Sequence, residues 1–307
     1  MVIVLYALTA LLYGGLAAHG WIRRNPALAA ARVGAGGGAS AVLVAGAGGA
    51  PGQRDGQPAW WHLAMIAVLA SHGLLLHETI FLPDHMVFGF AFALSSMLWL
   101  GVGIYWIESF FFSLAGLGLI VLPVALLASL MPLAFPGAEI LGVAARPLFK
   151  LHFIIANVAY GLFTLAAFHA FLMLAAERRL HGFKRMPGAE QPASRQLLGR
   201  WLDLLPPLLT LEKLLFRLIA AGFVLLTLTI VSGLGFSEQL FGRAFRLDHK
   251  TVFALVSWVM FGGILVGRIF YGWRGRVALR WVIASFGTLL LAYVGSRFVM
   301  EVVLHRI

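Results

Sequence analysis

The sequence predicts an all-α polytopic membrane protein, with one transmembrane domain over residues 1–307 that crosses the bilayer about eight times. Hydrophobic residues make up 61% of the chain, charged residues only 11%, and the mean hydropathy is +0.92. Since soluble proteins are about 25% charged, this composition excludes a soluble domain and a disordered chain. Uncharged apolar runs close to the ~20 residues that a membrane-spanning helix needs recur along the chain.

Eight runs qualify as spans, and their order defines the expected architecture. No Lys or Arg precedes the first run, while Arg23 and Arg24 follow it directly; this reverses a secretory signal, so we expect a retained helix. The fourth contains Pro123, where a kink is tolerated because neighbouring helices or water can satisfy the freed carbonyl. The eight spans lie at residues 1–21, 60–81, 86–106, 110–132, 150–175, 214–235, 251–271 and 281–303.

Basic residues sort the loops into two groups. The net charge of +11 comes from 23 Lys and Arg against 12 Asp and Glu, and 16 of the 23 fall in the loops after odd-numbered spans. Because cytoplasmic loops collect Lys and Arg, we expect these loops in the cytoplasm and both termini on the outer, periplasmic side of a bacterial inner membrane. The positive charge therefore reflects topology, and we expect no nucleic-acid partner.

Two stretches lack the pattern of a span. Residues 25–58 are dominated by Ala and Gly, which favour a flexible chain over a stable helix, so we expect a flexible cytoplasmic loop there. Residues 177–213 carry basic side chains between Leu residues and Trp201, followed by the pair Pro206-Pro207. We expect this stretch to be a basic cytoplasmic loop at the lipid interface.

The chain has no cysteine, which excludes disulfides, thiolate ligands and thioether attachment of heme. A metal or heme ligand must therefore be His, Met, Tyr or a carboxylate, and ten histidines make His the first candidate. His72 lies deep in the second span and His152 just inside the fifth, where a polar side chain is costly without a partner or a function. Six histidines fall on the expected outer side: His72, His77, His85, His152, His249 and His305.

Several of these side chains also have a structural interpretation. A histidine at the end of a span can simply hydrogen-bond lipid head groups or backbone, which applies to His77, His85 and His305. Arg297 can pair with Glu301 four residues later, or it can receive a heme propionate through two parallel hydrogen bonds. The outer-face carboxylates show no paired spacing for acid and base roles, so we expect no enzyme activity.

Five segments resemble a known family of membrane proteins. Lys150–Tyr160 carries a His followed by a Tyr, and Leu247–Trp258 carries Asp, Lys and Trp at matching places. Three shorter segments also match: Val224–Thr229, Gly272–Arg276 (Gly-Trp-Arg-Gly-Arg) and Ala292–Arg297 (Ala-Tyr-Val-Gly-Ser-Arg). Together they resemble the cytochrome c assembly protein family of the CcsA, CcmC and HemX types, above all its YpjD-like inner-membrane branch. The likeness is best over residues 60–307.

The resemblance implies heme handling and assigns the site residues. His152 matches the first outer-face heme ligand of the family, His305 is the counterpart of the second, and His72 resembles the histidine embedded in an early helix. His249 and Arg297 lie in matching segments and complete the candidate set, with Arg297 or Arg268 as a propionate partner. The resemblance thus implies heme b held by His72 and His152 near the outer face.

One departure from the family keeps a second role open. The stretch Phe241–Asp248 contains no Trp, whereas family members that present heme to apocytochrome have several around the Asp. We expect a heme-binding integral membrane protein of heme handling or cytochrome c biogenesis, whose partners are heme, the lipid bilayer and other cytochrome c assembly proteins. The alternatives are a HemX-like regulator, an interaction protein without a cofactor, and a small-solute transporter.

Overall fold

The computed structural model describes residues 2–24, 57–82, 85–140, 147–185, 206–241 and 249–304. In these ranges eight helices are long and apolar enough to cross a membrane, which confirms the predicted fold class. Residues 25–56 of the predicted Ala/Gly-rich loop, and His305, lie outside the described residues.

The elements follow the order of the predicted spans. The helices are α1 (Val2–Arg24), α3 (Ala59–Ile80), α4 (Phe90–Ser109), α5 (Ala115–Ala134), α6 (Pro147–Arg185), α8 (Leu208–Phe241), α9 (His249–Phe270) and α10 (Gly275–Leu290). The last span continues through η1 (Leu291–Gly295), α11 (Ser296–Phe298) and η2 (Val299–Val303), where η1 and η2 are wider π-helical turns. The strands β1 (Met86–Phe88) and β2 (Ala138–Ile140) pair antiparallel, with Val87 opposite Glu139.

Several helices extend beyond the uncharged runs that predicted them. α6 reaches Arg185 and α8 begins at Leu208, so both ends of the 177–213 stretch are helical, and residues 186–205 lie outside the described ranges. A helix satisfies its own backbone hydrogen bonds, so it can continue past charged residues into the head-group region. The third span starts later than predicted, because residues 86–88 form β1 and α4 begins at Phe90.

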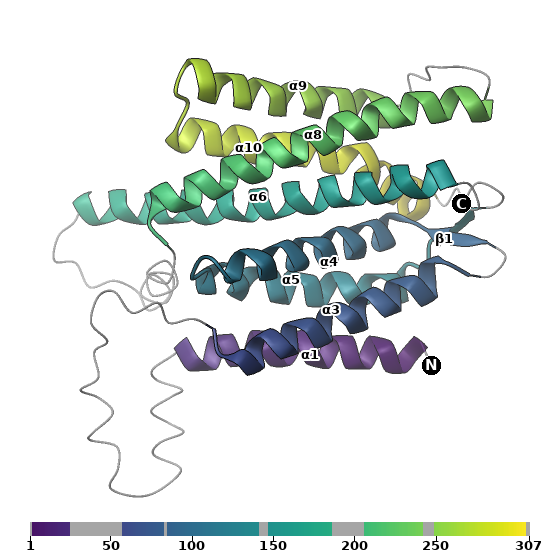
Figure 1. Cartoon of the computed structure of the whole chain (residues 1–307), viewed down its shortest axis with the longest axis horizontal. Helices are drawn as coiled ribbons and strands as arrows, with labels where there is room; N and C mark the ends of the chain where they lie inside the picture. The colour runs from purple at the N-terminus through teal and green to yellow at the C-terminus, as the bar shows by residue number, and fades with distance from the viewer. Residues whose placement is uncertain are drawn as a thin grey trace, which may run out of the picture.

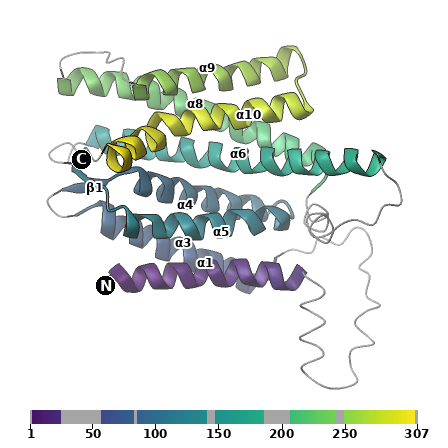
Figure 2. The same cartoon turned by 180° about the vertical axis from the view of Figure 1, so that it is seen from behind.

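α6 lies at the centre of the bundle. α4 and α8 pack against it from opposite sides, and α5 and α10 also contact it (Figure 1). α3 and α1 lie beyond α4, and α9 lies beyond α8 and α10, as the view from behind also shows (Figure 2). The start of α1, the end of the last span and the β1–β2 pair lie at one end of the bundle, which we call the strand end (Figure 1).

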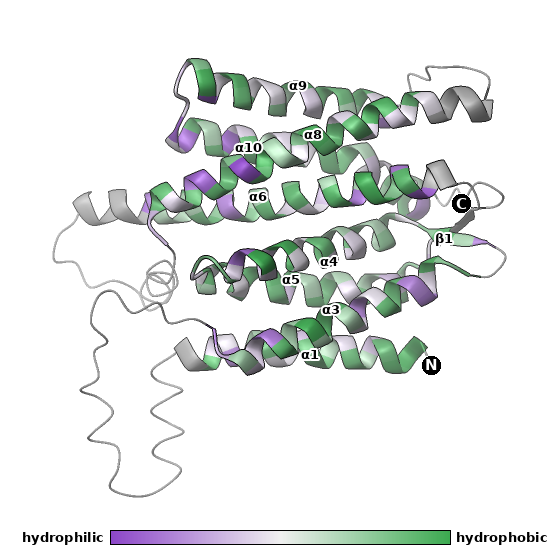
Figure 3. Ribbon diagram, in the orientation of Figure 1, coloured by the Kyte–Doolittle hydropathy of each residue, from purple (hydrophilic) through white to green (hydrophobic). Residues whose placement is uncertain are grey.

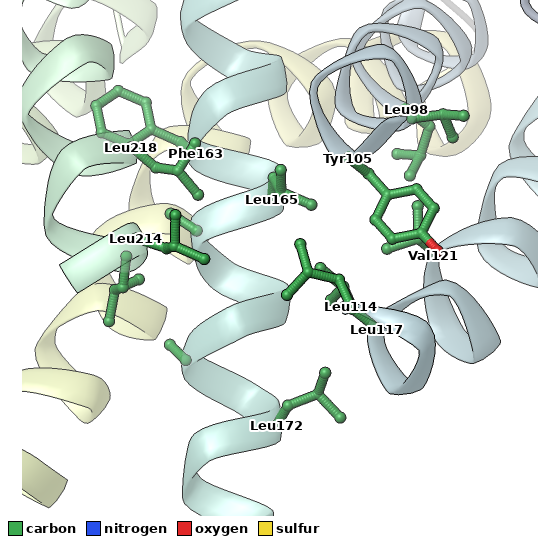
Figure 4. Close-up of a cluster of buried hydrophobic side chains, with 14 of the residues drawn as sticks. Leu98, Tyr105, Leu114, Leu117, Val121, Phe163, Leu165, Leu172, Leu214 and Leu218 are labelled. Carbon is green, nitrogen blue, oxygen red and sulfur yellow. The ribbon is translucent and has the colours of Figure 1, made fainter. Parts of the chain in front are cut away.

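The hydrophobic core lies on two sides of α6, between α6 and α4 with α5 and between α6 and α8. Figure 4 shows Tyr105 of α4 and Leu117 of α5 on one side of α6, and Leu214 of α8 on the other. All three are buried, as are Phe163 and Leu165 of α6, which contact the two halves. Because lipid is as apolar as these side chains, close packing and not escape from the surrounding medium stabilises the contacts.

The outward faces of the helices are apolar. Large side chains such as Ile3 of α1 (80% exposed) and Ile269 of α9 (74% exposed) point away from the core. Hydrophobic residues cover the helices along most of their length, while hydrophilic residues gather on α8 and α10 at the end opposite the strand end (Figure 3). A soluble monomer rarely exposes so much contiguous apolar surface, so lipid is the medium that covers these faces.

Candidate functional site

A cavity of about 220 Å³ lies at the strand end, between β1, α4, α6 and the last span. Its apolar lining consists of Met86, Phe88, Ala93, Met97, Phe153, Ala156 and Val294. Its polar lining consists of His152, Asn157, Tyr160, Tyr293 and Arg297. A concave apolar wall with a few polar groups is the usual form of a ligand site, so two of the predicted site residues, His152 and Arg297, share one cavity.

The imidazole of His152 is held in place by α8. Its Nδ1 lies 2.9 Å from Ser232 Oγ, and the Ser232 hydroxyl donates its only proton to the carbonyl of Thr229, 3.1 Å away. Ser232 Oγ therefore accepts the hydrogen bond from His152 Nδ1–H, which leaves the lone pair of the neutral ring on Nε2. Gly233 allows the close approach, because a Cβ at that position would lie 3.3 Å from His152 Cε1.

Arg297 forms a loose ion pair inside the same helix. Its Nη1 lies 3.8 Å from Glu301 Oε1, and Glu301 Oε2 accepts a 3.4 Å hydrogen bond from the backbone N–H of Phe90. Among the described residues, neither Arg297 Nε nor Glu301 Oε1 has a hydrogen-bond partner, although both atoms are buried. The geometry is compatible with both interpretations of Arg297. Its guanidinium pairs with Glu301, and its Nε–H can still donate a hydrogen bond to another group.

His72 lies elsewhere, between α1, α3 and α4. It is fully buried; its Nδ1 lies 3.0 Å from the Tyr13 hydroxyl and its Nε2 lies 2.9 Å from Ser95 Oγ. Both ring nitrogens are thus used by the protein, and His72 is not part of the lining of the strand-end cavity. The structure does not bring His72 and His152 to a common site.

Of the other predicted site residues, only His249 can be placed. His249 is exposed at the first position of α9, and His305 is outside the described residues. The neighbour of His249 does reach the site, because Lys250 Nζ lies 5.7 Å from the centroid of the Tyr293 ring, which lines the cavity. The start of α9 therefore adds a positive charge near the cavity, a contribution that residue types alone did not predict.

Polar groups on α6 that sequence reasoning did not select complete the cavity. Asn157 Oδ1 lies 3.0 Å from Ser96 Oγ of α4, and the Tyr160 hydroxyl donates a 3.1 Å hydrogen bond to the carbonyl of Leu289. His152 and Tyr160 are eight residues apart and so share a helix face. This spacing was a signal that could have identified Tyr160 from the sequence.

The Gly-Trp-Arg-Gly-Arg segment has a structural role at the opposite end of the bundle. Arg268 bonds both Glu212 of α8 and the carbonyl of Trp273, so the turn between α9 and α10 is tied to α8. Arg276 Nε donates a 3.2 Å hydrogen bond to Glu177 Oε2 of α6. These ion pairs anchor the last two spans to α6 and α8, far from the strand-end cavity.

The sequence matches the family described as Cytochrome C assembly protein over residues 60–304. Among curated proteins, it is 30% identical over 169 residues to an uncharacterized 28.8 kDa protein of Azospirillum brasilense, covering 55% of this chain and 58% of that protein. It is 29% identical over 190 residues to the inner membrane protein YpjD of Escherichia coli, covering 61% and 66%. It is 32% identical over 124 residues to the cytochrome c biogenesis protein CcsA of a Synechococcus strain, covering 40% and 36%.

These matches span less than two thirds of the length of each relative. No solved structure matches the chain. The family match nevertheless extends from the start of α3 to the end of the last span. With its eight apolar helices, the protein is a multi-pass inner membrane protein. The chain belongs to the cytochrome c assembly protein family.

Proposed function

We propose that the protein binds heme b in the strand-end cavity and holds it for another cytochrome c assembly protein, with no covalent chemistry of its own. The observation that carries the proposal is the joint presence of His152 and Arg297 in one apolar cavity. Imidazole ligates heme iron, and a guanidinium recognises a carboxylate such as a propionate. The relatives named for cytochrome c biogenesis support the same reading.

His152 would hold the heme iron through Nε2. Its hydrogen bond to Ser232 is the kind of outer contact that orients ligating histidines and sets their tautomer. When bound, heme would supply an iron that accepts imidazole and thioether ligands. The thioethers of Met86 and Met97 line the same cavity, and His72 does not, so we remove His72 from the proposed ligand set.

The donor groups fit heme better than the cavity volume does. Arg297 lines the cavity and Lys250 lies near it, beside Tyr293, so two positive charges are available for two propionates, and Phe88 and Phe153 supply apolar walls. The volume of about 220 Å³ is below the roughly 300–1,000 Å³ of pockets that enclose drug-sized ligands. Binding of a whole porphyrin therefore requires α4 and the last span to separate, or the ring to extend into the lipid.

The orientation of the site in the membrane is part of the proposal. Lys213 and Arg217 lie on α8 and Arg280 lies on α10, while Arg274 directly precedes α10. These two helices are hydrophilic at the end opposite the strand end (Figure 3). Cytoplasmic ends of spans collect Lys and Arg. The strand end, with the cavity and both termini, would then face the periplasm, where cytochromes c receive heme.

Heme titration of the full-length protein in detergent tests the proposal. The absorbance of added hemin should shift to a saturable Soret band in the parent protein, and His152→Ala should lose most of this band. His72→Gln is the matched control: it also changes a membrane histidine, but its amide can still donate and accept hydrogen bonds, so the band should remain. A parent without a saturable band, or a band unchanged in His152→Ala, would overturn the proposal.

A further inference from the structure

Glu108 and His169 face each other inside the bundle, at the end opposite the strand end. Glu108 lies in the last turn of α4, His169 lies on α6, and Glu108 Oε2 is 3.6 Å from His169 Nε2. The His169 side chain is 0% exposed and that of Glu108 only 11%. Within the described residues neither of the two facing atoms has a hydrogen-bond partner, although both are buried.

The tautomer of His169 follows from its other nitrogen. Nδ1 lies 3.0 Å from the carbonyl oxygen of Leu165, which can only accept a hydrogen bond. Nδ1 therefore carries a proton, and in a neutral imidazole Nε2 is left with a lone pair. An ionised Glu108 carboxylate also presents only lone pairs, so the two facing atoms would repel each other in a medium that screens poorly.

The two facing atoms are 3.6 Å apart, which is longer than a hydrogen bond and shorter than the about 4.4 Å at which a bridging water would hold them. A proton on one of the two groups resolves the conflict once the side chains approach by about 0.6 Å. Since burying two opposite charges is more costly than burying a neutral acid and a neutral base, the proton belongs on the carboxyl group.

We infer that Glu108 and His169 form a proton-binding site within the membrane, in which a protonated Glu108 carboxyl donates its Oε2–H to His169 Nε2. The ligand is a single proton, and the inference does not depend on heme. Because Glu108 is the partly exposed member and lies beside the turn that starts at Phe110, protons enter the site through the carboxyl group.

The surrounding charged groups have partners of their own. α5 contains no titratable residue. On α6 and α8, Glu177 pairs with Arg276 and Glu212 pairs with Arg268, and on α3 His62 stacks on Phe110. Among the side chains that the structure describes, the other titratable groups of the packed helices at this end include Tyr105, Arg178, Lys213, Arg217 and Arg280. Within the described part of the chain, none of these lies within ion-pair distance of Glu108 or His169.

The pair links the two helices that also form the strand-end cavity. α4 and α6 are in contact at Gly101 and Gly161, where a Cβ on Gly101 would lie 3.7 Å from the Gly161 carbonyl oxygen. Met97 precedes Gly101 on α4 and Asn157 precedes Gly161 on α6, so the cavity lies on one side of this contact. Glu108 and His169 follow the two glycines and lie on the other side. Loss of the proton would therefore replace an attraction by a repulsion at one end of the α4–α6 contact.

Infrared spectroscopy of the full-length protein in detergent tests the site. At neutral pH the parent should show the C=O band of a carboxylic acid, and Glu108→Gln should remove it. Glu212→Gln is the matched control and should leave the band in place, because Glu212 is equally buried but pairs with Arg268. A spectrum in which Glu108→Gln removes no acid band would overturn the inference.

Nitrogen NMR of the histidine-labelled parent protein gives a readout that needs no variant to fold. At about pH 8 exposed imidazoles are neutral, and His169 should also be neutral, with its proton on Nδ1 and a hydrogen-bonded Nε2. A persistent imidazolium signal at that pH would place the proton on His169 and overturn the assignment to Glu108. Thermal unfolding adds a third measure: the parent should lose stability at alkaline pH, and Glu108→Gln, a permanent donor, should not.

Discussion

Gly161 of α6 lies directly against Leu100 of α4: a Cβ on Gly161 would stand 2.8 Å from Leu100 Cβ. The same Cβ would lie 3.3 Å from the backbone nitrogen of Gly101. Small residues permit this kind of backbone approach between membrane helices, where packing is the main source of association. The contact lies between the strand-end cavity and the Glu108–His169 pair, so it sets the spacing of the two helices at both sites.

Gly161→Ala should lower the free energy of unfolding by roughly 1–3 kcal/mol, because the added methyl group overpacks the α4–α6 contact. Gly287→Ala is the control: it is an exposed helical glycine whose Cβ would meet nothing within 4 Å. That substitution should be neutral or stabilising by up to about 1 kcal/mol, since Ala favours helix. Thermal unfolding in detergent measures both, and equal stability of the two variants would contradict the close contact.

Tyr13→Phe should destabilise the protein by about 1–3 kcal/mol, because it leaves the buried Nδ1 of His72 without its partner. Heme binding should be unaffected, since neither residue lines the strand-end cavity. Tyr271→Phe, at a side chain that is 78% exposed, removes the same hydroxyl without a measurable change in stability. A Tyr13→Phe protein that keeps its stability but loses its Soret band would show that His72 serves heme after all.

Ser232→Ala should weaken heme binding about 10–100-fold, the usual effect of removing a group that orients a ligating histidine. The protein should still fold, because the Ser232 hydroxyl otherwise bonds only the carbonyl of Thr229 in its own helix. Ser257→Ala is the matched control, since Ser257 Oγ donates to the Phe253 carbonyl within α9. Hemin titration gives the two dissociation constants, and equal values would show that Ser232 does not orient His152.

Single cysteines will report the orientation without background, because the chain has none of its own. His249→Cys, at the exposed start of α9, should react with a membrane-impermeant maleimide in intact spheroplasts. Tyr271→Cys, at an exposed position directly after the end of the same helix, should react only after the membrane is permeabilised. The reverse labelling pattern would place the strand end in the cytoplasm and contradict the topology derived from the basic loops.

Much of the fold could be predicted from local sequence, because bilayer thickness alone sets the length of an apolar run. The eight spans were identified in this way, although the break predicted at residues 107–109 lies at residues 110–114, between α4 and α5. The ends were less accurate, as in α6, because helices continue past charged residues wherever water or head groups can solvate them. The β1–β2 pair was missed because two strands of three residues carry too little pattern to be recognised.

The candidate site, like the fold, could be predicted from the sequence only in part. Residue type and depth singled out His72 and His152 equally, since both are polar groups within apolar spans. Only the packing of α1 and α4 around α3 shows that both ring nitrogens of His72 are hydrogen-bonded, to Tyr13 and Ser95. Only the packing of α6 against α8 shows that Ser232 orients His152.

The sequence by itself determined that this is an eight-span membrane protein in which any metal or heme ligand is a histidine or another non-thiol group. These conclusions need only the hydropathy and the chemical type of each residue, which do not depend on the fold. Tertiary structure decided which histidine reaches a cavity, and it brought Glu108 against His169, 61 residues away in the chain. Such pairings depend on the rotation of each helix about its axis. That rotation is set by contacts between helices and leaves little trace in a chain that is apolar on nearly every face.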